Sequence, residues 1–335
     1  MVGKLTQRKL MILGVLLFIL LPSIIPTVAL TPQKINPSPL DGTIYVDDSN
    51  TAGPWDGSME HPYQTIQDGL FYAESGDTVF VFSGLYYSGG GSYSWISIQK
   101  SITLQGENPQ TTVIRGGGYY GAKNVIGINY DTGSCHISHF TIENSGTDIH
   151  DAGILINANN VTIAHNIIRD NVLGIYFSYT TTQSSAHIIG NIIENNSHGI
   201  FIWDATHNLI ENNIIRNNLF DGINLIYGSD HNIVQLNTIS GHTFPSESEG
   251  IIIKDSRNNL ITQNNFLENS VDSYFQNGFF NKWQNNYWNT SQKFIKIIFG
   301  VCIIGGGPME PGLHIPLFRM DTHPVQEPYE ILGMP

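Results

Sequence analysis

The chain is poor in charged residues, and those it has are mostly acidic. Asp, Glu, Lys and Arg make up only 13% of the 335 residues, about half of the ~25% found in typical soluble domains. The 28 acids and 15 bases give a formal net charge of -13. This charge argues against the basic surface that nucleic-acid binding needs, so we expect no nucleic-acid partner. Hydrophobic residues make up 41% of the chain, which excludes a disordered protein.

Cysteine is also scarce, which excludes a disulfide-rich scaffold. The chain has only Cys135 and Cys302, and neither has a second Cys or His at a spacing typical of zinc sites. Cys135 falls at an inward position of the repeat described below, so we expect a buried thiol there. A disulfide between the two cysteines remains the alternative in an oxidising compartment.

The N-terminus has the pattern of an export signal. Three basic residues precede an apolar run over Leu10–Leu21, and a small-residue cleavage site follows at Thr27–Ala29. We therefore predict a signal peptide over residues 1–29 and a linker over residues 30–43, with the mature protein secreted or on the cell surface. The alternative is an uncleaved membrane anchor over Leu10–Leu30, although two prolines weaken it as a spanning helix. After cleavage, we expect no stable membrane span.

A repeat fills the middle of the chain, from about residue 116 to residue 290. Its units hold two or three short alternating strands and leave no room for a helix, so each strand must pair in parallel with its equivalent in the next unit. This pattern predicts a single-domain, all-β solenoid, the parallel β-helix, in which isoleucines fill the interior and stacked asparagines bridge the corners. The corner asparagine recurs as Asn166, Asn191, Asn213, Asn237, Asn265 and Asn286.

Both ends of a solenoid need covering. Residues 44–115 read as an N-terminal cap with the first coils, including a short amphipathic helix within Gln64–Glu74. Residues 291–335 read as a C-terminal covering tail. Its apolar segment Phe294–Ile304 is too short to span a bilayer, so we expect it to cover the end or the flank of the solenoid.

The segment Ile44–Tyr86, followed by SITLQGE and the Asn/Gly coils, resembles exported NosD-type proteins. These proteins have the pectin-lyase-like fold and are common as archaeal surface proteins, and the closing segment Asp321–Leu332 is similar to tails in that group. The resemblance implies a right-handed coil and an extracytoplasmic location. It also implies either binding or hydrolysis of carbohydrate by the repeat, or a copper-handling accessory role. No set of catalytic residues comes with it.

An outward-facing aromatic ladder is the leading binding candidate. Period-two alternation turns Tyr176, Phe201 and Trp203 outward on adjacent coils, with Tyr179 and Tyr227 close by. Such a ladder suits stacking on sugar faces, so we expect a polysaccharide or another cell-envelope component as partner, bound without catalysis. The alternative is that the apolar tail segment folds back over the ladder and buries it.

Two groups of side chains could hold a metal ion. His139 and His165 occupy equivalent positions one coil apart, and His136 is close in sequence, so neutral imidazoles could bind Cu or Zn. Four acids around a Gly/Pro loop could offer oxygen ligands to Ca²⁺, although their spacing matches no fixed calcium loop. These acids are Asp47, Asp48, Asp56 and Glu60.

The enzyme alternative is a polysaccharide lyase or a glycoside hydrolase. A glycosidase needs two carboxylates roughly 5–9.5 Å apart, and a lyase needs a base such as Lys. Asp204 and Asp255 occupy equivalent outward positions two coils apart, and Lys254 adjoins Asp255. These three residues are the only catalytic candidates.

Overall fold

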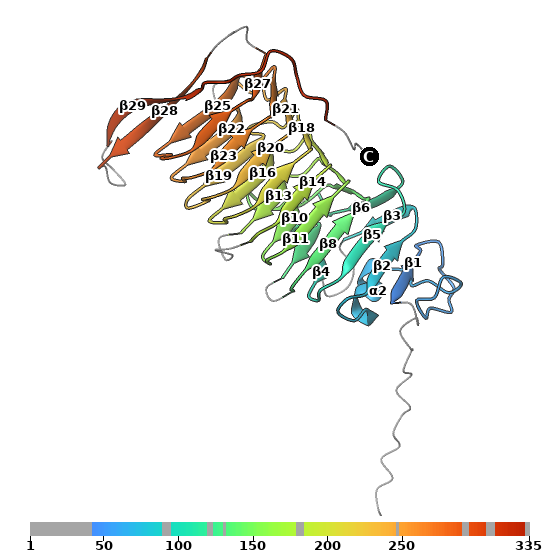
Figure 1. Cartoon of the computed structure of the whole chain (residues 1–335). Helices are drawn as coiled ribbons and strands as arrows, with labels where there is room; N and C mark the ends of the chain where they lie inside the picture. The colour runs from blue at the N-terminus through green and yellow to red at the C-terminus, as the bar shows by residue number, and fades with distance from the viewer. Residues whose placement is uncertain are drawn as a thin grey trace, which may run out of the picture. The chain divides into compact units, whose positions relative to one another are not determined.

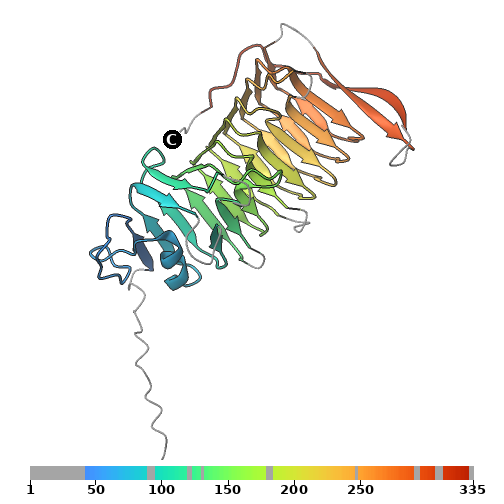
Figure 2. The same cartoon turned by 180° about the vertical axis from the view of Figure 1, so that it is seen from behind.

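The computed structural model describes residues 42–88, 95–118, 123–129, 132–178, 184–245, 248–289, 295–305 and 312–331. They belong to one compact unit, Pro37–Pro335, in which the chain winds through three sheets and successive coils lie side by side (Figures 1 and 2). Each full coil gives one strand to sheet 1, the next to sheet 2 and the third to sheet 3. The predicted all-β parallel β-helix is therefore confirmed. The predicted signal peptide lies outside the described residues.

The strands of each sheet follow one another in the order of the coils. Sheet 1 contains β1 (Thr43–Val46), β2 (Thr78–Val81), β5 (Thr103–Gly106), β8 (Cys135–Ser138), β11 (Val161–Ala164), β14 (His187–Ile189), β17 (Leu209–Glu211), β20 (Ile233–Gln235), β23 (Leu260–Thr262) and β26 (Lys282–Gln284). Sheet 2 contains β3 (Gly84–Tyr87), β6 (Thr112–Arg115), β9 (Thr141–Glu143), β12 (Ile167–Arg169), β15 (Ile192–Glu194), β18 (Ile214–Arg216), β21 (Thr238–Ser240), β24 (Asn265–Leu267) and β27 (Tyr287–Trp288). Sheet 3 contains β4 (Ile96–Ile98), β7 (Ile126–Ile128), β10 (Ala152–Ile156), β13 (Leu173–Phe177), β16 (His198–Trp203), β19 (Ile223–Ile226), β22 (Glu249–Lys254), β25 (Val271–Gln276), β28 (Lys296–Ile304) and β29 (Leu313–Asp321).

The interior is a set of stacked aliphatic columns. Ile154 pairs in register with Ile175, and Ile175 pairs with Ile200. Period-two alternation turns these side chains inward, where each buried aliphatic side chain contributes about 1.5–3 kcal/mol. The six residues predicted to face inward on these three coils are all fully buried: Ile154, Ile156, Ile175, Phe177, Ile200 and Ile202. Cys135 is a buried free thiol as expected, and burial raises its pKa to about 12.

Buried asparagines fix the register at the corner between sheets 1 and 2. The backbone N–H and side-chain amide of Asn191 both donate to Oδ1 of Asn213, at 2.9 and 3.0 Å. Each such contact satisfies corner backbone in one coil and ties it to the next coil. The first asparagine ladder consists of Asn166, Asn191, Asn213, Asn237, Asn264 and Asn286.

One member of this ladder differs from the prediction. Asn237 donates to Oδ1 of Asn264 at 3.0 Å, whereas Asn265 begins β24 and bonds Tyr329 in the C-terminal segment. The two asparagines are adjacent in sequence, and only the first occupies the corner. The other two corners carry ladders of their own. These consist of Asn171, Asn196, Asn218, His242 and Asn269 between sheets 2 and 3, and of Asn208, Asn232, Asn259 and Asn281 between sheets 3 and 1.

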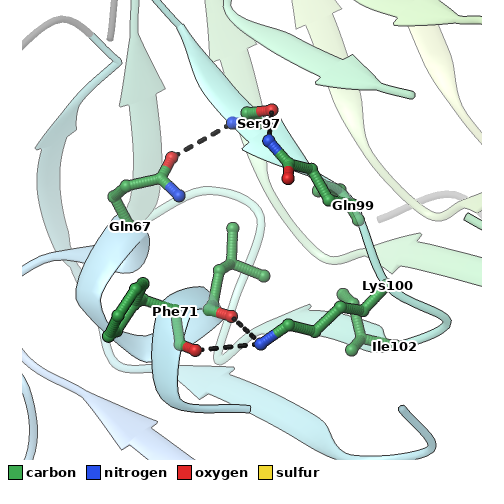
Figure 3. A pocket seen from close by; sticks show the side chains of 8 residues that line it. Gln67, Phe71, Ser97, Gln99, Lys100 and Ile102 are labelled. Atoms are coloured by element: carbon green, nitrogen blue, oxygen red, sulfur yellow. Dashed lines mark hydrogen bonds between the residues drawn. The ribbon is translucent and has the colours of Figure 1, made fainter. Parts of the chain in front are cut away.

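The N-terminal cap contains the predicted helix, α2 (Ile66–Tyr72), against the first strands of sheets 1 and 3. The Oγ1 atom of Thr65 caps it by accepting from the N–H of Asp68 at 3.1 Å. A cavity of about 270 Å³ lies between α2 and β4. Figure 3 shows that polar side chains around this cavity bond within the cap. Lys100 donates to carbonyls at the end of α2, and Gln67 accepts from the N–H of Ser97 on the edge strand β4.

The apolar tail segment extends the solenoid instead of covering its flank. Lys296–Ile304 forms β28, which pairs with β25 at the end of sheet 3, and β29 pairs antiparallel with β28. Because β25, β22 and β19 separate β28 from β16, this segment does not cover the aromatic ladder on β13 and β16. Cys302 lies on β28 as a partly exposed free thiol, so no disulfide joins it to Cys135.

Candidate functional site

The turns from sheet 3 back to sheet 1 form an exposed surface on four consecutive coils. We call residues 203–207, 226–231, 254–258 and 276–280 the turn surface. Its first column is Asp204, Tyr227, Asp255 and Asn277, whose φ angles of 53°, 52°, 49° and 49° place each in the left-handed region. Backbone bonds align the column, because each of the first three residues donates its N–H to the next coil. The sequence thus builds the same sharp corner four times and places two aspartates, a tyrosine and an asparagine on it.

A glycine makes room for the carboxylate of Asp204. Gly228 follows Tyr227 with a φ of 91°, and a Cβ atom there would lie 2.9 Å from Oδ1 of Asp204. A side chain at residue 228 would therefore be strained in its backbone and would crowd this carboxylate.

Two aromatic rings meet across neighbouring coils at this corner. The ring centroids of Trp203 and Tyr227 are 5.1 Å apart and the planes are tilted by 40°. Tyr227 is 51% exposed, whereas Trp203 is half-buried against a small apolar cluster on the outside of sheet 3. At this corner the structure thus brings together Trp203 and Tyr227, two of the five aromatic residues predicted for binding.

The prediction that Tyr176 is exposed is wrong. Its side chain is only 5% exposed, because the ring of His150 stacks on it at 5.6 Å and Phe201 packs edge-on at 5.9 Å. Phe201 itself is half-buried in the same cluster. Tyr179 lies outside the described residues.

The two candidate carboxylates lie where the repeat predicts. Asp204 follows β16 and Asp255 follows β22, with β19 between them, so the two coils are roughly 10 Å apart. Tyr227 occupies the intervening position. Oδ1 of Asp255 accepts a hydrogen bond from Nδ2 of Asn277 at 2.7 Å, and Lys254 is partly buried. The coil spacing places the pair at the upper limit of the separation that inverting glycosidases use.

A cavity of about 330 Å³ opens at the C-terminal part of the turn surface, beside Asp255. Phe280 on its wall is 73% exposed. Arg257 on the same wall is held by Asp230, which accepts from its backbone N–H at 2.8 Å and from Nε at 3.1 Å. The cavity is lined by Asp255, Ser256, Arg257, Asn277, Phe279 and Phe280.

Arg257, Phe279 and Phe280 were not predicted as site residues. The sequence does contain a signal for them: Arg257 stands two residues before the ladder asparagine Asn259, and Phe279 and Phe280 stand directly before Asn281. Aligning the turns on those asparagines would have placed all three beside Asp204 and Tyr227.

The predicted adjacency of two histidines is confirmed at another corner, between sheets 1 and 2. The ring centroids of His139 and His165 are 5.7 Å apart. Burial lowers the pKa of His136, and nearby His139 and His165 lower it further. The pKa of His139 is also lowered, by burial and then by the charge of His165. His136 and His139 are therefore neutral near pH 7.

A second ionisable pair, His198 and Asp221, lies between sheets 2 and 3. Nδ1 of His198 is 3.3 Å from Oδ2 of Asp221, and the ring of Phe220 stacks on His198 at 5.1 Å. Burial by itself would raise the pKa of Asp221, but hydrogen bonds from its neighbours and the charge of His198 outweigh it, and the pKa is lowered. The arrangement fixes the orientation of the imidazole.

Three of the four acids proposed for Ca²⁺ serve local contacts, and the fourth, Glu60, is exposed. Asp47 accepts from the N–H of Ser49 at 2.8 Å, and Asp48 accepts from the N–H of Leu85 at 3.0 Å. Asp56 is paired with its own loop. In the part of the chain that the structure describes, no three His, Cys, Asp or Glu side chains are grouped closely enough to hold a metal ion.

Solved structures of other β-helix proteins are similar to this one. A complex of XylC with xylose has a TM-score of 0.51 at 11% identity, over 73% of this chain and 65% of that chain. The A-module of mannuronan C-5 epimerase AlgE6 from Azotobacter vinelandii has a TM-score of 0.46 at 15% identity, over 72% and 76%. The catalytic domain of a GH87 alpha-1,3-glucanase, solved with nigerose, has a TM-score of 0.45 at 13% identity, over 67% and 45%. This chain thus spans less than half of the glucanase domain, and the likeness to XylC shows the fold alone.

No curated protein matches the sequence. The family model described as periplasmic copper-binding protein (NosD) matches residues 73–307, which include every coil of the turn surface and the strand β28. Because this match covers more than half of the chain, the protein belongs to the NosD family of β-helix proteins.

Proposed function

We propose that this protein binds polysaccharide, or another glycan of the cell envelope, across the turn surface without cleaving it. The observation that carries the proposal is the contact between Trp203 and Tyr227, next to two carboxylates and an aromatic-walled cavity. Aromatic faces stack on the apolar faces of sugar rings, and side chains with both donors and acceptors bond the hydroxyl groups.

The geometry suits an extended glycan that runs along the helix axis. Consecutive coils are about 4.8 Å apart, so such a chain meets a new side chain of the turn surface on each coil. It passes Asp204, Tyr227, Asp255 and Asn277 in turn. The binding energy then comes from several weak contacts.

The charges favour neutral or amino sugars over uronic acids. Asp204 and Asp255 face the proposed path, and the charge of Arg257 is offset by Asp230. The chain as a whole carries a net charge of -13. An anionic polymer would therefore be repelled unless a cation bridged the two.

The second candidate is a glycoside hydrolase or lyase that uses Asp204, Asp255 and Lys254. The spacing of two coils between the carboxylates favours it. The side chain of Tyr227 stands at the position between them, where a hydrolase needs space for the scissile bond, and this favours binding without cleavage.

Because the NosD family is described as copper-binding, we tested whether the described residues could hold a copper ion. His139 and His165 offer two neighbouring imidazoles, and the buried thiol of Cys135 belongs to the hydrophobic core. Neither the predicted His136 nor any other side chain completes a group of three ligands with them among the described residues. The described residues therefore do not fit a copper site, and we assign the protein no copper chemistry.

NosD proteins are exported, and an envelope glycan is a partner that an exported protein meets. We propose that the signal peptide over residues 1–29 carries this chain out of the cytoplasm. None of the helices that the structure describes is long and apolar enough to cross a membrane.

Retention on a panel of insoluble neutral, amino-sugar and uronic-acid polysaccharides tests the proposal. We expect the wild-type protein to be retained by a neutral or amino-sugar polymer, and Trp203→Ala and Tyr227→Ala to lose most of that retention. Trp55→Ala is the matched control, because Trp55 is an exposed tryptophan in the N-terminal cap. Absence of retention on every polymer, or equal retention of all variants, contradicts the proposal.

A further inference from the structure

The hairpin formed by β28 and β29, which we call the arm, extends past the end of the last coil. At its base, Nζ of Lys296 bonds Asp272 at 2.8 Å, and the buried Asp321 bonds Asn286. Farther along, β25 pairs with β28 only at Gly300 and Val301. The far end of the hairpin therefore projects beyond β25, as Figures 1 and 2 show.

The outer face of the arm is apolar from one end to the other. Successive side chains of a strand point to opposite faces. Ile298 is buried, so its neighbours Ile297 and Phe299 point outward. Residues directly opposite in an antiparallel pair share a face, so the partners of these two residues on β29 point outward as well. Phe299 is 69% exposed and its partner Phe318 is 59% exposed. The pairs on this face are Ile297 with Met320, Phe299 with Phe318, Val301 with Pro316 and Ile303 with His314.

The described residues of the arm include no exposed acid, although the protein is strongly acidic. In residues 295–305 and 312–321 the one acid is Asp321, which is fully buried. Two copies of a chain with a net charge of -13 repel each other over most of their surfaces. The outer face of the arm is a surface where two copies can meet without that repulsion.

We propose that the arm is a dimerisation element, in which the outer faces of two arms pack against each other across a two-fold axis. This inference uses a different part of the molecule from the turn surface and does not depend on glycan binding. An isologous contact needs a self-complementary surface. The arm supplies one, because it carries an exposed apolar end and, at its base, a cavity of about 500 Å³. The walls of this cavity include the apolar Val271, Ile297 and Phe299, and beside them the paired Asp272 and Lys296 and one further acid, Glu268.

The exposed apolar surface of the outer face can form the centre of a dimer contact. Its large side chains are Ile297, Phe299, Phe318 and Met320, which expose on the order of 450 Å² together, given 150–250 Å² for a whole aromatic residue. A stable interface buries about 800 Å² per partner, so these four side chains supply about half of it. Ile304, Leu313 and Ile315 are exposed on the opposite face of the hairpin.

A second copy fits the arm better than a lipid bilayer does. Among the strands that the structure describes, β29 is the last of sheet 3, so one edge of its backbone has no described neighbouring strand. Open sheet edges do not occur in the hydrocarbon region, where unpaired N–H and C=O groups cost several kcal/mol each. In a protein dimer this edge stays in contact with water, while the apolar face is covered.

Sedimentation equilibrium of the purified protein over a wide concentration range tests this proposal. We expect wild type to have the mass of two chains, and Phe299→Glu and Phe318→Glu each to raise the dissociation constant at least about a hundredfold, because both copies bring a charge into the contact. Phe71→Glu is the matched control and should leave the dimer intact, since Phe71 is 71% exposed on α2. Circular dichroism of each variant checks that it is folded.

Three results would overturn the dimer. Wild type that stays monomeric at every concentration is one, and a dimer that neither arm variant weakens is another. The third is monomeric wild type that co-sediments with phosphatidylcholine and phosphatidylglycerol vesicles and loses this binding in both variants, which would assign the arm to a membrane surface.

Discussion

The carboxylate of Asp321 accepts hydrogen bonds from both the backbone N–H and the side-chain amide of Asn286, at 2.9 and 3.1 Å. In the coil before, Oδ1 of Asn286 accepts the same two bonds from Asn264, at 3.0 and 3.1 Å. Asp321 therefore supplies the oxygen that one more ladder asparagine would supply. The ladder ends on a side chain from the C-terminal hairpin, and this contact joins the hairpin to the last coil.

We expect Asp321→Ala to destabilise the C-terminal coils by about 3 kcal/mol or more, because it leaves several buried donors without an acceptor. Asp321→Asn retains one side-chain oxygen and should cost clearly less. Denaturant unfolding of the two variants beside wild type measures the difference. Equal losses in both variants would show that the negative charge, and not the ladder geometry, holds the end of the solenoid.

The corrected register gives a second prediction. Asn264→Ala removes a buried side chain that bonds the coils on both sides, so we expect a loss of about 2–3 kcal/mol. Asn265→Ala removes contacts to Tyr329 in the C-terminal segment and should cost less. Thermal unfolding of both variants compares them. A larger loss for Asn265→Ala would return the ladder to the register that the sequence predicted.

Stability should fall as the pH drops below about 6.5, the unperturbed pKa of histidine. Burial lowers the pKa of His136, His139 and His242 in the folded protein. Between those lowered values and 6.5, the unfolded chain binds protons that the folded chain does not bind, so acid favours unfolding. Below the lowered values this contribution levels off.

His242→Asn should reduce this dependence on pH. His242 occupies an asparagine position in the ladder between sheets 2 and 3. Its backbone N–H donates to Oδ1 of Asn269 at 3.3 Å, as the asparagines of the ladder do, so we expect asparagine to fit there. Melting temperatures of both proteins between about pH 5 and pH 8 measure the effect. An unchanged pH profile in the variant would mean that His242 binds a proton as readily in the folded chain as in the unfolded chain, or that other groups dominate.

The carboxylates of the turn surface should contribute to binding and not to turnover. We expect Asp204→Asn and Asp255→Asn each to weaken glycan retention by about three- to tenfold, the effect of roughly 1 kcal/mol of hydrogen bonding. Long incubation of wild type with the retained polymer should release no oligosaccharide. Released product that disappears in either variant would establish the hydrolase or lyase in place of the binding protein.

The repeat made most of the coil architecture predictable. The alternation of apolar and other residues along each strand was enough to place Ile154 and Ile156 inside. Only one face of each strand reaches the core, and every second side chain lies on that face. The same periodicity placed Asp204 two coils from Asp255. The spacing between strand and corner distinguishes Asn264 from Asn265 as well. Asn264 stands three residues after the inward Ile261, as Asn213 does after Ile210, and the predicted Asn265 stands one residue too far along.

What the periodicity of the strands could not predict depends on the turns between strands and on the C-terminal segment. Tyr176 faces outward as expected, yet His150, from the turn that precedes β10, stacks on its ring. The apolar composition of the tail segment is typical of a segment that covers a core, but the composition also suits a β-strand. The segment forms a strand because the edge of β25 offers backbone groups with which it can pair. The wall formed by Phe279 and Phe280 follows from the sequence only when the turns are aligned on the ladder asparagines Asn259 and Asn281.

Titration of Trp203 fluorescence with soluble fragments of the retained polysaccharide tests the central claim most directly. A Trp55→Phe background separates this signal from the exposed tryptophan of the cap. We predict a saturable change, and a dissociation constant about 5- to 30-fold higher in Tyr227→Ala, the equivalent of 1–2 kcal/mol of lost ring contact. A dissociation constant unchanged in Tyr227→Ala, or no change in fluorescence with any fragment, would contradict glycan binding at the turn surface.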